Sequence, residues 1–225
     1  MQYQRAVYQS LRNVLFDVMH DLESETSRLP PAFVEKSLKV QALQATILRE
    51  IHAVLGRRIQ STRLRCHGDC QLHQVLFTGK DFVFIDFEGR SDQSIGERRI
   101  KRSPLRDVAS LLRSFDYAAH AALFGLSYGR GRAAGAIRDE DRPALLPWAR
   151  AWRLWTHNAF LQGYLEICGD EPFVPGHEEE RNVLWRVLLL DQLLMELSKE
   201  LRTRSDWLEI PLTGILEVIE PPPDA

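Results

Sequence analysis

Three oxygen-bearing side chains in the first half of the sequence have types and spacing suited to chemistry on a hydroxyl group. Asp69 lies in a loop after a helical segment, and Gln74 follows at the start of an apolar run. Asp86 ends a second apolar run. The pattern predicts an aspartate that orients or deprotonates an attacking hydroxyl, beside amide and carboxylate oxygens of the kind that bind Mg²⁺.

A β-hairpin is the element that must bring Gln74 and Asp86 together. Residues 75–77 and 82–85 are rich in β-branched and aromatic side chains, and a glycine-containing turn at 78–81 separates them. A hairpin places the start of its first strand beside the end of its second. We therefore expect the two side chains to lie close to each other.

Helices are predicted on both sides of this hairpin. Apolar residues at helical spacing indicate helices at about 5–23, 33–55, 104–124, 143–167 and 178–201, and a short one after Pro211. Ser103 and Pro104 are typical of an N-cap and a first helical residue. The expected fold class is α+β, mostly α-helical, with a short hairpin carrying the metal site.

The chemical stretch resembles the kinase pattern H-x-D-x-x-x-x-N followed by D-F-G. Here it stands as His67-x-Asp69-x-x-x-x-Gln74, then Asp86-Phe87-Glu88-Gly89. The glutamine and the additional glutamate resemble the aminoglycoside phosphotransferase and choline-kinase branch of this fold, which phosphorylates small molecules.

The ordered motifs resemble the bacterial maltokinases still more closely. The run H-G-D-x-x-L-x-Q-V-L, D-F-x-x-I-D-F-E-G and S-P-L-R-D-V-A-x-x-L-R-S-F-D-Y-A-A lies within residues 67–119, and similar segments follow at 160–164 and 206–216. The resemblance implies that residues 1–225 form one kinase-like C-terminal catalytic lobe. Its expected parts are leading helices (1–60), the catalytic loop and metal hairpin (61–90) and a helical subdomain (103–225).

This resemblance also implies an activity. Maltokinases phosphorylate maltose to maltose 1-phosphate with ATP and Mg²⁺, and many are fused to trehalose synthase. Maltose and trehalose synthase are therefore the expected partners. Two alternatives stay open, a non-catalytic scaffold domain of trehalose synthase and a kinase of another small sugar or alcohol.

Roles for individual residues follow from the resemblance. The implied set is Asp69 as the catalytic aspartate, Gln74 and Asp86 as metal ligands, His67 and Asp107 as supports of the catalytic loop, and Glu88 as a second metal or substrate ligand. The sequence departs from the family pattern at Cys70, Gln71 and His73, where an aromatic residue, a histidine and a glycine are more familiar.

Further side chains are weaker candidates for substrate contact. They are Arg113, Asp116, Tyr117 and Trp152. An internal ion pair between Arg113 and Asp116 is the more common role for charges at this helical spacing. The three tryptophans at 148, 152 and 155 could stack on sugar rings, although aromatic residues at helical spacing more often belong to a core.

Two other clusters have competing interpretations. Cysteines and histidines at 66, 67, 70 and 73 have a spacing that disfavours a zinc site. The basic run between Arg98 and Arg106 either attracts phosphate or a missing lobe, or is a solvated segment paired with Glu97 and Asp107. Both interpretations of the basic run stay open.

Composition limits the remaining function classes. The chain has 225 residues, 44% of them apolar, and a formal net charge of −2, which does not favour nucleic acid or a membrane as the main partner. Three cysteines fit a cytoplasmic protein better than a disulfide framework. None of the five lysines is predicted in a strand before Asp69, so we expect the nucleotide-binding N-lobe to be absent and to be supplied in cis or in trans.

Overall fold

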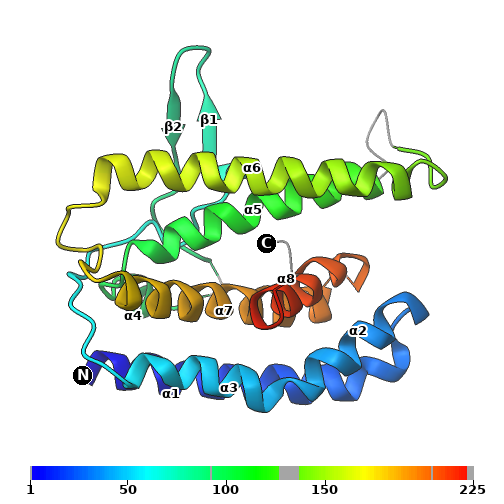
Figure 1. Ribbon diagram of the computed structural model, residues 1–225, viewed down its shortest axis with the longest axis horizontal. Coiled ribbons are helices and arrows are strands. Elements are labelled where there is room, and N and C mark those ends of the chain that lie inside the picture. The colour runs from blue at the N-terminus through cyan, green and yellow to red at the C-terminus, as the bar shows by residue number, and fades with distance from the viewer. Residues whose placement is uncertain (1, 92, 127–136, 204, 222–225) are drawn as a thin grey trace. The chain divides into compact units, whose positions relative to one another are not determined.

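The computed structural model describes residues 2–91, 93–126, 137–203 and 205–221. These residues are mostly helical, with one two-stranded antiparallel sheet (Figure 1). The predicted α+β, mostly α-helical fold class is thereby confirmed, while its identity as a kinase-like C-lobe stays a prediction. Among the described helices, none is both long and apolar enough to cross a membrane.

The chain forms two compact units, which are described separately. One comprises Met1–Ser61 and Pro175–Ala225, and the other Thr62–Val174. The expected division of a single domain at residues 60, 90 and 103 stays a prediction.

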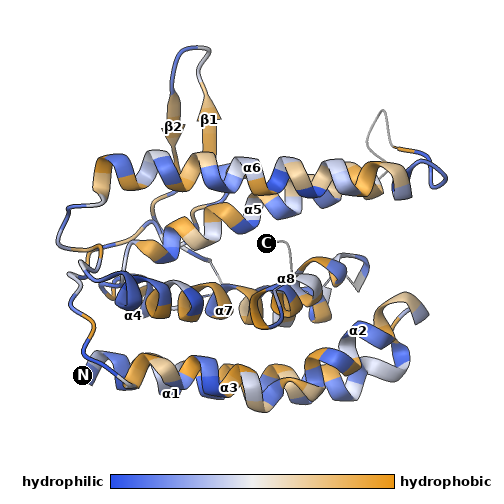
Figure 2. Cartoon of the chain, in the orientation of Figure 1, coloured by the Kyte–Doolittle hydropathy of each residue, from blue (hydrophilic) through white to orange (hydrophobic). Residues whose placement is uncertain are grey.

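The first unit is an all-helical bundle. Its helices are α1 (Gln2–Glu25), α2 (Pro31–Ala42), α3 (Gln44–His52), α7 (Glu178–Thr203) and α8 (Glu209–Ile219), with 3₁₀ turns at Thr26–Arg28, Ala53–Leu55 and Ser205–Trp207. Helix α1 packs on α3 and α7, and α8 packs on α2 and α7. Figure 2 shows the apolar stripes that these helices carry. The fully buried side chains of the unit include Leu15, Leu22, Ile47, Ile51, Leu190, Leu194, Leu197 and Leu212.

The prediction of one helix over 33–55 was wrong, because the chain bends at Leu43. This residue has φ −86° and ψ 3°, outside the helical region, and its N–H is shared between the carbonyls of Lys39 and Val40. No proline or glycine marks the bend. The bend gives the two halves different neighbours, since α2 packs on α8 whereas α3 packs on α1 and α7.

The second unit carries the predicted chemistry. It contains a 3₁₀ turn (η3, Leu72–Gln74), strands β1 (Val75–Phe77) and β2 (Phe82–Phe84), and helices α4 (Ile95–Arg98), α5 (Leu105–Phe124) and α6 (Arg142–Cys168). The strands pair antiparallel with Val75 opposite Phe84 and Phe77 opposite Phe82, which confirms the predicted hairpin. Helices α5 and α6 pack side by side (Figure 1).

The start of α5 differs from the prediction. Pro104 is the N-cap, and the hydroxyl of Ser103 is buried without a hydrogen-bond partner, so Ser103 is not a side-chain cap. Its carbonyl instead accepts the N–H of Arg106.

The short helix α4 was not predicted, although Ser94 and Glu97 form a capping box at its start, a signal that the sequence carries. At the other end of α5, Gly125 takes the left-handed conformation of a C-cap (φ 63°).

Candidate active site

Helix α5 holds the predicted catalytic loop at two points. The carboxylate of Asp107 accepts the backbone N–H of His67 through Oδ2 (2.7 Å) and of Gly68 through Oδ1 (3.0 Å). Two turns further along the helix, the hydroxyl of Ser114 accepts the N–H of Leu72 (3.1 Å). Both anchors therefore lie on one side of α5. Asp69 lies in the segment that they bracket.

The His67 side chain links this loop to the residue before Asp86. Its Nδ1 accepts the N–H of Asp69 (3.3 Å), so Nε2 carries the proton of a neutral ring and donates it to the carbonyl of Ile85 (2.7 Å). The ring also contacts that of Phe87, with centroids 4.8 Å apart. His67 thus contacts both the catalytic-loop backbone and the segment after β2, where Asp86 lies between its two partners, Ile85 and Phe87.

Two glycines allow the same segments to approach. Gly68 (φ 85°) and Gly89 (φ 77°) both lie in the left-handed region, where a Cβ is strained. A Cβ added to Gly68 would lie 3.4 Å from the Cα of Gly89, and one added to Gly89 would lie 3.5 Å from the carbonyl oxygen of His67. The catalytic loop and the segment after Asp86 are therefore in contact along their backbones.

The hairpin places Gln74 and Asp86 at its open end. Beyond the last strand pair, the N–H of Ile85 donates to the carbonyl of Gln74 (3.0 Å), so Ile85 lies opposite Gln74 and Asp86 follows one residue later. Asp86 has φ 60°, and it is the one residue other than glycine with positive φ among those described. Asparagine and aspartate tolerate this region better than bulkier residues, and such conformations gather at functional sites.

The donor set fits a magnesium ion better than zinc. Gln74 is buried, Asp86 is exposed, and neither side chain forms a hydrogen bond or ion pair with another described residue. No cluster of three or more His, Cys, Asp or Glu side chains suited to a metal occurs in the described residues. Mg²⁺ needs only one or two protein oxygens when substrate phosphates and water complete its shell. Glu88 is exposed two residues further on and stays a predicted second ligand.

Gln71 is a site residue that the sequence did not reveal as functional. Its side-chain Nε2 donates to Oδ1 of Asp69 (2.9 Å), and its carbonyl accepts the N–H of Gln74 (2.9 Å). The sequence showed only that Gln71 departs from the maltokinase pattern. Ser114 was also missed, and the signal that could have found it is its spacing of two helical turns from Asp107.

Burial of groups near Asp107 opposes their ionisation. Burial raises the pKa of Asp107 itself, against the two backbone N–H groups that favour its charged form. Burial, followed by the charge of Asp107, raises the pKa of Cys66 to about 11 and of Cys70 to about 12. Burial, with Cys168 and Asp107 nearby, raises the pKa of Tyr164 to about 12. The two loop cysteines are therefore thiols rather than reactive thiolates at neutral pH.

The candidate substrate residues on α5 lie in a buried ion-pair cluster. Arg113 pairs with Asp116, as the sequence indicated. The other oxygen of Asp116 faces Nε2 of His157 (3.0 Å) and Nε of Arg153 (3.6 Å) on α6. Burial alone would raise the pKa of Asp116, but Arg113, His157 and Arg153 together outweigh it and lower that pKa. Tyr117 is also buried, so a role for these residues in substrate contact stays a prediction.

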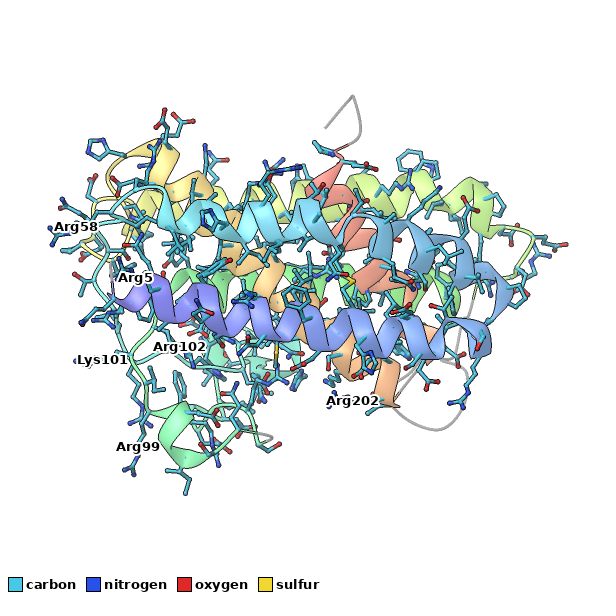
Figure 3. The ribbon with its side chains drawn as sticks, turned by 90° about the horizontal axis from the view of Figure 1, so that it is seen from below. Arg5, Arg58, Arg99, Lys101, Arg102 and Arg202 are labelled. Carbon is cyan, nitrogen blue, oxygen red and sulfur yellow. The ribbon has the colours of Figure 1, made fainter. Side chains whose placement is uncertain are left out.

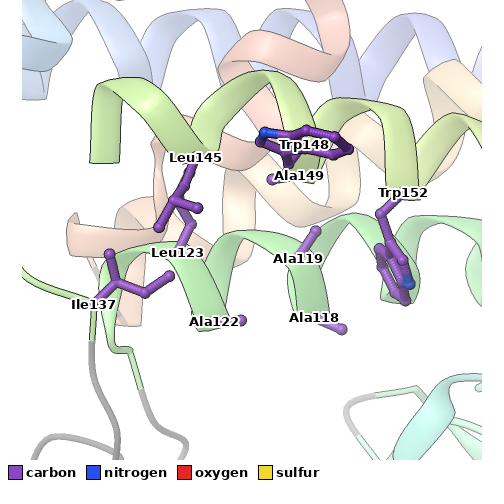
Figure 4. A pocket seen from close by; sticks show the side chains of 9 residues that line it. All are labelled: Ala118, Ala119, Ala122, Leu123, Ile137, Leu145, Trp148, Ala149 and Trp152. Carbon is purple, nitrogen blue, oxygen red and sulfur yellow. The ribbon is translucent and has the colours of Figure 1, made fainter. Parts of the chain in front are cut away.

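The tryptophans of α6 are not core residues in the described structure. Trp148 is 74% exposed and Trp155 73%, and Trp152 is 45% exposed. Trp148 and Trp152 border an apolar pocket of about 450 Å³ between α5 and α6 (Figure 4). Its other lining residues are Ala118, Ala119, Ala122, Leu123, Ile137, Leu145 and Ala149. Contact of Trp152 with a sugar stays a prediction.

The basic segment after the metal hairpin lies partly against the site. Arg98 donates to the carbonyl of Glu88 (3.4 Å), and its aliphatic stem covers Gly89. Arg102 exchanges two backbone hydrogen bonds with Leu64, each 2.9 Å. Figure 3 shows Arg99 extending away from α4. The segment is thus held by its backbone and by Arg98, and attraction of phosphate by its exposed cations stays a prediction.

Known proteins similar to this chain are sugar kinases. No family model matches the sequence. Glucosamine kinase from Mycolicibacterium smegmatis is 25% identical over an alignment of 217 residues, which covers 86% of this chain and 49% of that enzyme. The chain thus spans about half the length of this curated relative.

Solved glucosamine kinase structures resemble the chain in fold. One in complex with glucosamine, ADP and inorganic phosphate has a TM-score of 0.67 at 16% identity, and it covers 94% of this chain and 45% of that one. Another, described as crystal form A, gives a TM-score of 0.64 at 15% identity, and the match covers 93% of this chain and 46% of that one. The likeness shows that the chain has the fold of about half of such an enzyme.

Proposed function

We propose that this chain is the catalytic half of an ATP-dependent sugar kinase. The observation that carries the proposal is the braced loop, in which Asp107 holds the N–H groups of His67 and Gly68 while His67 binds the carbonyl before Asp86. This arrangement keeps Asp69 close to the predicted metal residues. Positioning of this kind is most of what a protein contributes to phosphoryl transfer.

Asp69 is the proposed group that orients the acceptor. Its Oδ1 accepts a hydrogen bond from Nε2 of Gln71, and no other described residue donates a hydrogen bond to Oδ2. Oδ2 can therefore accept the hydroxyl proton as the acceptor oxygen bonds to the γ-phosphorus of ATP and the bond from that phosphorus to the leaving ADP breaks. Gln74 and Asp86 would hold Mg²⁺, which when bound neutralises charge on the phosphate oxygens. Glu88 would add a carboxylate beside them.

The acceptor is proposed to be a small sugar. Glucosamine is a first choice because the matched relative and the solved structures carry that name. Maltose is a second choice because the run from His67 to Ala119 resembles the maltokinases. Since the chain spans about half of the matched relative, the nucleotide-binding half is proposed to come from elsewhere, in cis or in trans.

A scaffold role is the second candidate. The chain spans about half of its relative, and no lysine-bearing strand precedes Asp69 in the described structure. In that role the chain would dock on another enzyme, for which trehalose synthase is the proposed partner. The braced loop that carries Asp69, together with the oxygen-bearing side chains of Gln74 and Asp86, favours the kinase.

ADP release tests the two candidates. The assay uses Mg-ATP with glucosamine, maltose, trehalose or glucose, and compares the chain alone with any longer reading frame that contains it. A kinase releases ADP with one of these sugars and releases much less after Asp69→Asn, whereas the exposed control Asp139→Asn stays active. If every form is silent with every sugar, the kinase proposal fails and the scaffold takes its place.

A further inference from the structure

We propose that Gln71 is a positioning residue that fixes the orientation of the Asp69 carboxylate for phosphoryl transfer. This inference rests on the proposed function. It begins from the hydrogen bond between Nε2 of Gln71 and Oδ1 of Asp69, which is 2.9 Å long. No other side chain among the described residues forms a hydrogen bond with the Asp69 carboxylate.

An aspartate needs such a partner because its terminal torsion is soft. Rotation of a carboxylate about Cβ–Cγ meets only a broad, roughly two-fold barrier, so either oxygen could otherwise face the acceptor. A donor on Oδ1 selects one orientation and leaves Oδ2 available. A misplacement of about 1 Å at a reacting group can cost on the order of 100-fold in rate.

The backbone of Gln71 is itself held in place, which limits the positions that its side-chain amide can reach. Its carbonyl accepts the N–H of Gln74 (2.9 Å), and the next residue, Leu72, donates its N–H to Ser114 on α5 (3.1 Å). Gln71 is half-buried and extended, with φ −130° and ψ 164°. One residue thus contacts the proposed catalytic aspartate through its side chain and a proposed metal ligand through its backbone.

The neutral amide has a further consequence. Glutamine does not titrate, so it donates to Asp69 over the whole working pH range. A glutamate at this position would place a second carboxylate against the first and lose the donor. Gln71→Leu removes the donor at similar size, and Gln71→Glu replaces attraction with repulsion.

A double-mutant cycle tests the positioning role in whichever form, the chain alone or a longer reading frame, phosphorylates a sugar. We expect Gln71→Leu to lower kcat about tenfold or more, with the KM for ATP changed less than about twofold. On an Asp69→Asn background, Gln71→Leu should change kcat by less than about twofold, because the group it positions is already altered. The exposed control Gln162→Leu should leave kcat unchanged. Equal effects of Gln71→Leu on both backgrounds would show a merely structural role and overturn the proposal.

A second measurement does not depend on turnover. In ¹⁵N-labelled chain, the side-chain amide signals of Gln71 should move clearly after Asp69→Ala and stay in place after Asp81→Ala at the hairpin turn. Unchanged Gln71 signals in Asp69→Ala would refute the contact, whether or not the protein is a kinase. Moved signals in a protein that phosphorylates no sugar would instead support the contact and reject the proposed function.

Discussion

Asp107 is the residue on which the geometry of the candidate site most depends. Both of its oxygens are used, each by one backbone N–H of the catalytic loop. A backbone donor left without a partner in a half-buried position costs about 1–3 kcal/mol. The side chain of one helical residue thus fixes the start of a loop forty residues earlier in the sequence.

Replacement of Asp107 tests this dependence. We expect Asp107→Ala to lower the free energy of unfolding by about 2–6 kcal/mol, since two loop N–H groups lose their acceptor. Asp107→Asn, which keeps one acceptor oxygen, should have a smaller effect. Urea unfolding followed by circular dichroism measures both. The exposed control Asp139→Ala should change stability by less than about 1 kcal/mol, and an equal loss in the control would contradict the assignment.

Asp116 should make the protein sensitive to acid. Its pKa in the folded chain is lowered, so its charged form contributes stability above its ordinary pKa of about 4, and this contribution is lost as pH falls through the lower folded value. Asp116→Asn should destabilise the protein at pH 7 by roughly 3–5 kcal/mol, because the carboxylate charge that faces Arg113, Arg153 and His157 is removed from a buried site.

Unfolding in urea at pH 7 and near pH 3 measures this difference. The wild type should lose more stability between the two pH values than Asp116→Asn does. The exposed control Glu23→Gln should show the acid sensitivity of the wild type. An identical pH dependence for wild type and Asp116→Asn would show that this carboxylate is not the cause.

Among the helices and strands, those with a local sequence signal were predicted, whereas the bend at Leu43 was not. The alternation and turn at 75–85 predicted the hairpin, because strand pairing there depends on neighbouring residues. The bend at Leu43 carries no proline or glycine, and it is set by contacts with α1, α7 and α8, which are distant in sequence. The site shows the same limit. Asp69, Gln74 and Asp86 were recognisable from spacing, but the contacts of Gln71 and Ser114 depend on how the loop lies on α5.

The capping box of α4 gives a prediction at the scale of a single helix. Ser94 and Glu97 satisfy each other's backbone N–H groups at the start of a helix of only four residues. We expect Ser94→Ala to cost about 1 kcal/mol locally and to speed amide hydrogen exchange over residues 95–100. Ser10→Ala on the exposed side of α1 is the control. Unchanged exchange in Ser94→Ala would show that other contacts hold this helix.

The whole molecule is organised as two units with different roles. The described chemical residues all lie in Thr62–Val174, whereas the large apolar core belongs to the helices of the other unit. Leu197 is fully buried there, and Leu38 on α2 of the same unit is 53% exposed. The large apolar core can therefore be perturbed without replacing any of the described chemical residues.

A matched pair of truncations tests this organisation. Leu197→Ala should lower the free energy of unfolding by about 2–5 kcal/mol, since it leaves a cavity in a closed core. Leu38→Ala should have an effect of about 0.5 kcal/mol or less. Thermal unfolding of the two variants measures this difference. A similar loss of stability in both would contradict the assignment of Leu197 to the core.

Asp69 is proposed to act in phosphoryl transfer to a sugar. ³¹P NMR tests this role on Mg-ATP incubated with glucosamine or maltose and the longest reading frame that contains this chain, as wild type and as Asp69→Asn. We expect a sugar-phosphate signal whose rate of appearance falls by about 10²–10⁴ in Asp69→Asn. Equal rates in the two proteins, or no sugar phosphate with either acceptor, would contradict it.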